Sequence, residues 1–261
     1  MIGTLSLILL LLMMLIGGER GAISVIALFG NIVILSVAIF FLATGLSPII
    51  VVPAVSLLSG RLTLTKQNGR NAKTSAALLS TLVIMLVMTP FIALFMRSAA
   101  GGGFHELRLI EEDIDLYFKQ SLNIPMLQIF VSITILSALG AVLDTTLSVA
   151  SVVYEVYRHN PQDTRRDLFS SGMRVGKDII GTTTNTLLFA YMADTLLLAA
   201  YLHQREIGLA YILNSRFLFQ AVTVMLFGQL ACVLAVPTAS FFIAKRLKEG
   251  DKNDSGKRKT E

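Results

Sequence analysis

The stretch LGAVLDTTLSVASVVYEVY, residues 139–157, is an apolar helix pattern with one carboxylate, Asp144, in its interior. The apolar run that contains it is long enough to cross a bilayer, which takes about 20 residues in a helix. An ionised carboxylate at the centre of a membrane helix costs on the order of 3 kcal/mol on insertion scales, so it is expected to face protein or water rather than lipid. The stretch therefore predicts a membrane protein and makes Asp144 the first candidate functional residue.

The composition of the whole chain agrees with this interpretation. Of 261 residues, 54% are hydrophobic and 15% are charged, whereas ordinary soluble domains are roughly 25% charged. Apolar windows recur along nearly the whole length and leave no polar block large enough for a separate soluble domain. We therefore predict a single transmembrane domain over residues 1–245. Residues 246–261, rich in Lys, Asp, Ser and Gly, are predicted to be a disordered, basic cytoplasmic tail.

Residue types that would indicate a metal, a cofactor or a nucleic acid are few or scattered. The one cysteine, Cys232, has no partner, and the three histidines fall in separate predicted loops, so we expect no metal site. Neither a GxxxxGK(S/T) nor a GxGxxG string is present, and we expect no cofactor. The net charge of +5 comes from basic residues that flank membrane segments, and orientation during insertion explains them better than nucleic-acid binding does.

Seven windows have the hydropathy of membrane helices. They cover about residues 2–16, 22–42, 46–59, 75–96, 123–157, 178–202 and 217–244. The third window contains two prolines, so we expect either a kinked helix or one arm of a tight hairpin. The predicted fold class is thus all-α, a polytopic transmembrane helix bundle of about seven spans, with six to eight as the range.

Basic residues gather on one side of this predicted stack. Seventeen of the 22 Lys and Arg lie near residue 20 and within 61–73, 158–177 and 245–261, and five lie on the other side. By the positive-inside rule the basic side is cytoplasmic. We therefore predict a multi-pass protein of the plasma membrane with its N-terminus outside and its C-terminus in the cytoplasm.

The pair Asn160-Pro161 is typical of a helix start, with Asn160 as the cap and Pro161 at the first helical position. Apolar residues at positions 168, 169, 173 and 175 stand among basic residues. We expect either a short amphipathic helix at the inner membrane surface or a plain connector before the span at 178–202.

Polar or small residues line one face of each of two predicted spans. Their spacing of three or four positions places them on one side of a helix. The opposite face of the first span, which includes Leu139 and Val142, is expected to meet lipid or other helices. We predict that the two polar faces pair. Their members are Ser137, Gly140, Asp144, Ser148, Ser151 and Glu155 in the first span and Asp178, Gly181, Thr182 and Asn185 in the second.

These faces hold residues suited to moving a proton or a cation. We predict Asp144 as the central group of a relay, and its neighbours in that relay are Asn185, Thr182, Ser148 and Ser151. Secondary candidates are Asp178, Glu155 and Asp194. Asp178 and Glu155 are expected near the inner boundary, and Asp194 in the outer half of its span. The alternative is a structural carboxylic acid that fixes helix pairing through a hydrogen bond to Thr145, Ser148 or Asn185.

The strings LGAVLDTTLSVASVVYE and NPQDTRRDLFSSGMRVGKDIIGTTTNTLLFAY resemble the YibE/F family of bacterial multi-pass membrane proteins. The resemblance is densest over about residues 123–245 and implies a bacterial plasma-membrane protein without a defined biochemical activity. More remotely, Asp144, the helix after it and the Thr-rich span resemble the membrane part of SecF-type and resistance-nodulation-division (RND) transporters. That resemblance implies an RND/SecF-like C-terminal half with a proton-relay Asp, although this chain has one such Asp rather than a pair.

Two functions remain open from the sequence, and neither is enzymatic. The first is a permease-like subunit that couples proton or cation movement through Asp144 to transport or export. The second is a non-transporting scaffold that assembles with a paralogous YibE/F subunit, or with copies of itself, through Gly172-x-x-x-Gly176 and the face of Gly140, Ser148 and Ser151. An aspartyl protease that pairs Asp144 with Asp178 or Asp194 is disfavoured, because Asp144 ends the string GAVLD rather than the GxGD expected of that class.

Overall fold

The computed structural model describes residues 1–99, 126–204, 208, 210 and 213–257, apart from the side chains of 126, 194–195, 197–199, 201–204, 217 and 251–257. Within these ranges every regular element is a helix, as predicted. The helices are α1 (Ile2–Ala43), α2 (Pro48–Asn68), α3 (Ala72–Ser98), α5 (Met126–His159), α6 (Arg165–Gln204) and α8 (Arg216–Lys257).

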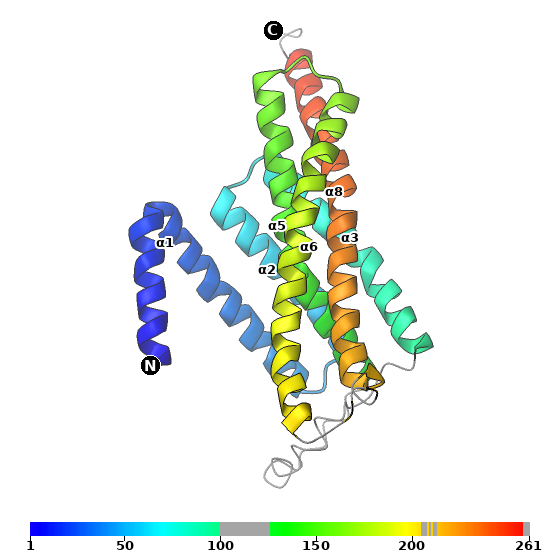
Figure 1. The fold of residues 1–261 in the computed structure, drawn as a ribbon. Helices are drawn as coiled ribbons and strands as arrows, with labels where there is room; N and C mark the ends of the chain where they lie inside the picture. Colours follow the sequence, from blue (N-terminus) through cyan, green and yellow to red (C-terminus); the bar gives the residue numbers. More distant parts are fainter. Residues whose placement is uncertain (100–125, 205–207, 209, 211–212, 258–261) are drawn as a thin grey trace.

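Five of these helices, α1, α2, α3, α5 and α8, are long and apolar enough to cross a membrane. They support a multi-pass membrane protein, but the predicted number of seven spans is not confirmed. Helix α6 falls outside the five, as far as its described residues go, because charged residues fill its first turns and Thr and Asn follow them. The two chain ends lie toward opposite ends of the bundle (Figure 1).

Helix α1 contains the first two predicted windows and folds back on itself at Gly18. This residue has φ 54° and ψ −134°, a backbone conformation that glycine adopts far more readily than other residues. Beyond the bend, Gly21 lies against the backbone carbonyl of Met13, where a Cβ atom would collide. The two arms therefore form a helical hairpin, and its first arm stands away from the other helices (Figure 1).

The third predicted window is a continuous helix. Pro48 begins α2, Pro53 lies inside it, and the helix runs on to Asn68, well beyond the predicted end at residue 59. Gly69, with φ 72°, ends it. Asn71 then caps α3, since its Oδ1 accepts a hydrogen bond from the backbone N–H of Thr74 at 2.9 Å.

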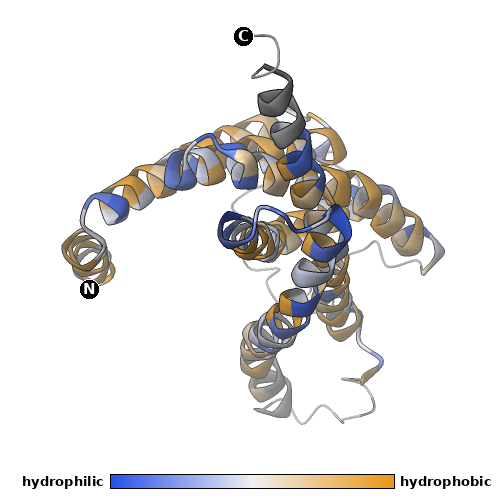
Figure 2. Ribbon diagram, turned by 90° about the horizontal axis from the view of Figure 1, so that it is seen from above, coloured by the Kyte–Doolittle hydropathy of each residue, from blue (hydrophilic) through white to orange (hydrophobic). Residues whose placement is uncertain are grey.

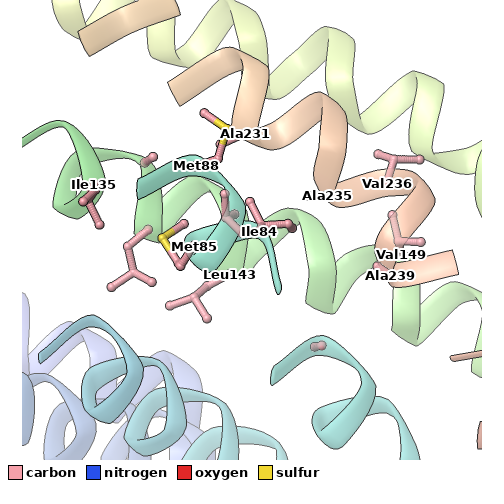
Figure 3. Close-up of a cluster of buried hydrophobic side chains, with 14 of the residues drawn as sticks. Ile84, Met85, Met88, Ile135, Leu143, Val149, Ala231, Ala235, Val236 and Ala239 are labelled. Carbon is pink, nitrogen blue, oxygen red and sulfur yellow. The ribbon is translucent and has the colours of Figure 1, made fainter. Parts of the chain in front are cut away.

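Helices α5 and α8 form the centre of the bundle, and α3, α6 and α2 pack around them. The apolar face of α5 is buried here, so of the two expected surroundings it meets helices rather than lipid. On α8, Ala231, Ala235 and Ala239 are fully buried at a spacing of four. Small residues at this spacing let two helix backbones approach closely. They face a cluster that includes Met85 and Met88 of α3 (Figure 3).

A polar clamp holds the second arm of α1 on α2. Asn31 Nδ2 donates to Thr63 Oγ1 at 2.9 Å, and Ser59 Oγ donates to Asn31 Oδ1 at 2.8 Å. Both ends of the Asn31 amide are therefore satisfied within the chain, which matters in a bilayer because lipid offers no substitute partner. The clamp is the specific link of α1 to the rest of the protein, since α1 packs mainly on α2.

The predicted helix start at Asn160-Pro161 is wrong. Residues 160–164 form a loop, and α6 begins at Arg165 behind a reciprocal cap. The Thr164 backbone N–H donates to Asp167 Oδ2 at 3.0 Å, and the Asp167 N–H donates to Thr164 Oγ1 at 3.3 Å. This pair satisfies two helix-end donors at once, whereas the Asn160 amide is engaged with the Asp163 carboxylate at 2.6 Å. Helix α6 then continues without a break, so no separate surface helix precedes it.

Three helices are much longer than a bilayer is thick. At 1.5 Å per residue, the 34, 40 and 42 residues of α5, α6 and α8 correspond to about 51, 60 and 63 Å, against roughly 30 Å of hydrocarbon. They extend past the ends of α1–α3 at the end where the C-terminus lies (Figure 1). There α8 runs to Lys257, through most of the predicted tail, and residues 258–261 lie outside the described ranges.

The clamp predicts a measurable coupling between α1 and α2. In a double-mutant cycle of Asn31→Ala and Thr63→Val, we expect a coupling free energy of about 0.6 kcal/mol, and up to about 1.7 kcal/mol, typical of hydrogen bonds between membrane helices. The measurement is the free energy of unfolding in a detergent titration. A matched cycle with Ser36→Ala should show no coupling, because Ser36 Oγ bonds only the Ile32 carbonyl of its own helix. Equal coupling in both cycles would contradict the clamp.

The cap of α6 predicts a pH dependence. Hydrogen bonds from the Thr164 hydroxyl and backbone N–H, together with the charge of Arg166, hold the pKa of Asp167 below its ordinary value. A folded-state pKa below the unfolded one stabilises the helix start above the ordinary carboxyl pKa, and this effect is lost as pH falls through the lower folded value. We expect amide-exchange protection at the start of α6 to fall over that range in the wild type. Asp167→Asn should show a low, pH-independent protection, and an unchanged pH profile in that variant would refute the cap.

Candidate functional site

Asp144 lies on the outer surface of α5. Its side chain is exposed, while those of its neighbours Leu143, Thr145 and Thr146 are buried. No hydrogen bond links Asp144 to another described residue, so the helix-pairing bonds considered for it, to Thr145, Ser148 or Asn185, are not made within the chain. The packed side of α5 thus fixes the helix rotation that turns Asp144 outward.

The predicted polar face of α5 exists and is exposed. Gly140, Asp144, Ser148 and Glu155 are exposed, and Ser137 and Ser151 are half-buried. Over residues 137–159 α5 exposes no large hydrophobic side chain, whereas α1 and α3 expose many. This face, which we call the α5 polar face, is therefore chemically unlike the lipid-compatible surface of the other helices.

Helix α6 carries a second exposed polar surface. Asp178, Gly181, Thr182 and Asn185 are all exposed, and its first exposed large hydrophobic side chain is Phe189. Thr182 Oγ1 bonds the Ile179 carbonyl of its own helix at 3.0 Å. The two polar faces therefore do not pair within the chain: no hydrogen bond links the described residues of one set to those of the other. Asp194 has a side chain outside the described set.

The reason is the glycine pair of α6. A Cβ atom on Gly172 would collide with Ser240 and Val153, and one on Gly176 would collide with Val236. These glycines let α6 lie tightly on α8, which turns the polar residues of α6 away from the bundle. Gly172-x-x-x-Gly176 is therefore an internal contact, and the prediction that it forms an assembly surface is wrong. A Cβ atom on Gly140, by contrast, would enter open space, so that position remains available for assembly.

The packing also locates Asp144 along the bundle. Counted from Met126, Asp144 is 18 residues or about 27 Å along α5. A methyl on Gly60 of α2 would touch the Leu143 side chain at 3.2 Å, which sets the exposed Arg61 level with Asp144. Arg61 precedes the end of α2 at Asn68 by seven residues, or about 10 Å, so α5 extends past α2 only beyond the level of Asp144.

A cavity lies at the end of the α5 polar face. It is lined by Ser151, Glu155, His159, Asn160 and Asp163, together with two valines. Hydrophilic residues mark this end of α5 and the loop to α6 (Figure 2). Among the described residues no group of three His, Cys, Asp or Glu is placed to hold a metal ion.

His159 and Asp163 extend the face beyond the residues singled out from the sequence. Ser151, Glu155 and His159 continue the spacing of three or four that carries Asp144 and Ser148, and this spacing is the signal that would have identified His159. Its Nδ1 lies 2.9 Å from the Glu155 backbone oxygen. The polar face thus runs from Asp144 to an open cavity that holds two carboxylates and an imidazole.

The glycine contacts predict opposite effects at two positions. Gly176→Leu must displace Val236 and should lower the free energy of unfolding by about 2 kcal/mol or more, as overpacked sites do. Gly140→Leu adds a side chain in open space and improves helix propensity, so it should leave stability equal or raise it by up to about 1 kcal/mol. Detergent titration of the two purified variants measures this difference. Similar losses in both would show that the two glycines are equivalent.

Comparison with known proteins gives one result. A family model described as YibE/F-like protein matches residues 5–249, which is far more of the chain than the segment 123–245 of densest resemblance. No curated protein and no solved structure matches the chain, and the RND/SecF-like arrangement of the C-terminal half is therefore not confirmed. With a helical, multi-pass architecture and a match over nearly its whole length, the chain belongs to the YibE/F-like family.

Proposed function

We propose that this protein is a permease-like subunit of the bacterial plasma membrane that couples the movement of a proton or cation to transport or export. Asp144 is the group that takes up and releases the ion. The N-terminus of the protein lies outside the cell, and its C-terminus lies in the cytoplasm. The proposal assigns no catalytic reaction and no cofactor.

The observation that carries the proposal is the continuity of the α5 polar face. From Asp144, the hydroxyls of Ser148 and Ser151 lead along one side of the helix to Glu155, and the cavity with His159 opens there. Successive positions are three or four residues apart, about 5–6 Å along the helix, so single water molecules can bridge them. An ion arriving from the basic end of the bundle can therefore reach Asp144 along polar groups.

A relay on an exposed face needs a cover, because a charged group beside lipid is costly. Helix α6 has suitable residues at a similar level. Thr182 is 17 residues or about 25 Å from the start of α6, and Asp144 is 15 residues or about 22 Å from the end of α5. Both point outward, so a neighbouring subunit, either a paralogue or a second copy, can bring its Thr182 and Asn185 opposite Asp144. The partner then completes the relay.

A non-transporting scaffold is the second candidate. The observation in its favour is the open space at Gly140 on the same face, with the half-buried Ser151 further along it. Small residues on an unoccupied helix face suit close helix packing. In this alternative the polar face serves only to recognise the partner subunit, and the charge state of Asp144 has no role.

The test is ion flux into liposomes that contain the purified protein, followed over a range of pH. For a relay, Asp144→Asn should reduce proton or cation flux to the level of empty liposomes, because Asn cannot release a proton. The matched control is Glu19→Gln, which removes an exposed carboxylate at the bend of α1 and should leave flux unchanged.

The two candidates separate in the same preparation. Flux retained by a correctly folded Asp144→Asn protein would rule out the relay. If no variant conducts, and Gly140→Leu abolishes assembly while Asp144→Asn preserves it, the scaffold function holds instead. Assembly is measured by the mass of the purified complex in detergent, and folding by helical circular dichroism.

A further inference from the structure

Three arginines from distant parts of the chain line one cavity on the side of α2, α3 and α8. Arg61 lies on α2, Arg70 lies in the turn between α2 and α3, and Arg246 lies on the projecting part of α8. Thr65, Asn71 and Ser75 also line this cavity, which we call the arginine cavity. It is separate from the α5 polar face and its end cavity, which share none of these residues.

Within the part of the chain that the structure describes, the arginine cavity gathers positive charge without a counter-charge. No described acidic residue lines it, and none of the three guanidinium groups makes an ion pair with a described residue. The nearest acid along α8, Glu249, pairs with Lys245 at 3.7 Å instead. Like charges gathered in one cavity repel one another, so the arrangement is favourable once an anion occupies it.

Membrane orientation does not account for this convergence. The positive-inside rule requires basic residues in the loops on one side, but it does not require Arg246 to meet residues from α2 and its turn. Packing enforces the meeting. Leu247, next to Arg246, is buried in the core together with Ala76 and Ala77 of α3. Arg246 thus lines the same cavity as Asn71 and Ser75 at the start of α3.

The remaining groups in the cavity suit a phosphate. Helix α3 begins here, and the start of a 27-residue helix presents free N–H groups and a positive dipole end to an anion. Asn71 Oδ1 accepts a hydrogen bond from the N–H of Thr74, and the N–H groups of the residues before Thr74 in the first turn are left for an anion. Arginine presents a planar fork of donors that matches two oxygens of one phosphate, and three arginines line this one cavity.

We propose that the arginine cavity binds a phosphate group at the inner membrane boundary. Arg70 and Asn71 belong to the turn that joins the end of α2 to the start of α3, so the cavity lies at the ends of two candidate membrane helices, where headgroups are met. The phosphate belongs either to an anionic phospholipid headgroup or to a free phosphate ion in the cytoplasm. The chemistry of recognition is the same for both sources.

The experiment uses the full chain in nanodiscs of phosphatidylcholine alone and in nanodiscs that also contain phosphatidylglycerol. Retained phosphatidylglycerol is counted by native mass spectrometry, and the unfolding temperature is measured in parallel. We expect Arg246→Gln to weaken phosphatidylglycerol retention on the order of fivefold. Arg174→Gln, which removes an exposed charge of α6 outside the cavity, should change it little.

A second arm separates the two sources. The phosphatidylcholine nanodiscs are titrated with inorganic phosphate, with chloride of equal ionic strength as the reference. If phosphatidylglycerol alone stabilises the wild type, the ligand is a headgroup; if inorganic phosphate also does so, the cavity accepts the free ion. Either result supports the proposal when Arg246→Gln removes the effect.

Two results would overturn it. One is that neither probe stabilises the wild type, and the other is that Arg174→Gln loses as much as Arg246→Gln, which would indicate a general surface charge. Should Arg246→Gln lower helical content, Arg70→Gln on the exposed turn replaces it, since that side chain has no packing role. Flux through Asp144 is not part of this readout, so the two proposals fail independently.

Discussion

The packing of α5 on α8 and α3 sets the rotation of every helix that carries a candidate site. Val142, Val149 and Val153 are fully buried in the same core as the alanines of α8, and Val153 also lies against Gly172 of α6. Lipid is as apolar as these side chains, so the contact gains from close van der Waals packing rather than from escape from water. Because a helix has a fixed period, burying this set forces the residues on the opposite side, Asp144 among them, outward.

The same constraint passes from α8 to α6. Gly172 and Gly176 seat α6 on Ser240 and Val236. The polar residues that follow lie on the opposite side of the helix from these glycines and therefore face outward. Two polar faces that look complementary in sequence are thereby both committed to the exterior. The two faces can still pair, but only when one of them belongs to a second chain. The tertiary packing of one subunit thus defines the chemistry of its contact with another.

The features that depend on neighbouring residues in one helix could be predicted from the sequence, and those that depend on contacts between distant parts of the chain could not. Periodicity identified both polar faces, because it depends only on neighbours within one helix. It could not say which face is buried, since in a membrane protein a polar face can turn toward a helix, a channel or a partner. The start of α6 was misplaced because Asn160-Pro161 and the Thr164–Asp167 pair are both sound helix starts locally, and the loop geometry decides between them. The arginine cavity could not be predicted from the sequence, because Arg246 and Arg61 are far apart in the chain and line one cavity only in the folded protein.

Each of the two proposed sites includes a residue beside the contact between α2 and α5. Arg61 and Asp144 each stand one residue from the Gly60 and Leu143 contact, which is the point where α2 touches α5 at this level. Their charges are opposite, but no ion pair joins them among the described residues. A phosphate bound to Arg61 would contact α2, and Gly60 of α2 packs directly on Leu143. The contact between Gly60 and Leu143 therefore joins the helix that carries Arg61 directly to the helix that carries Asp144.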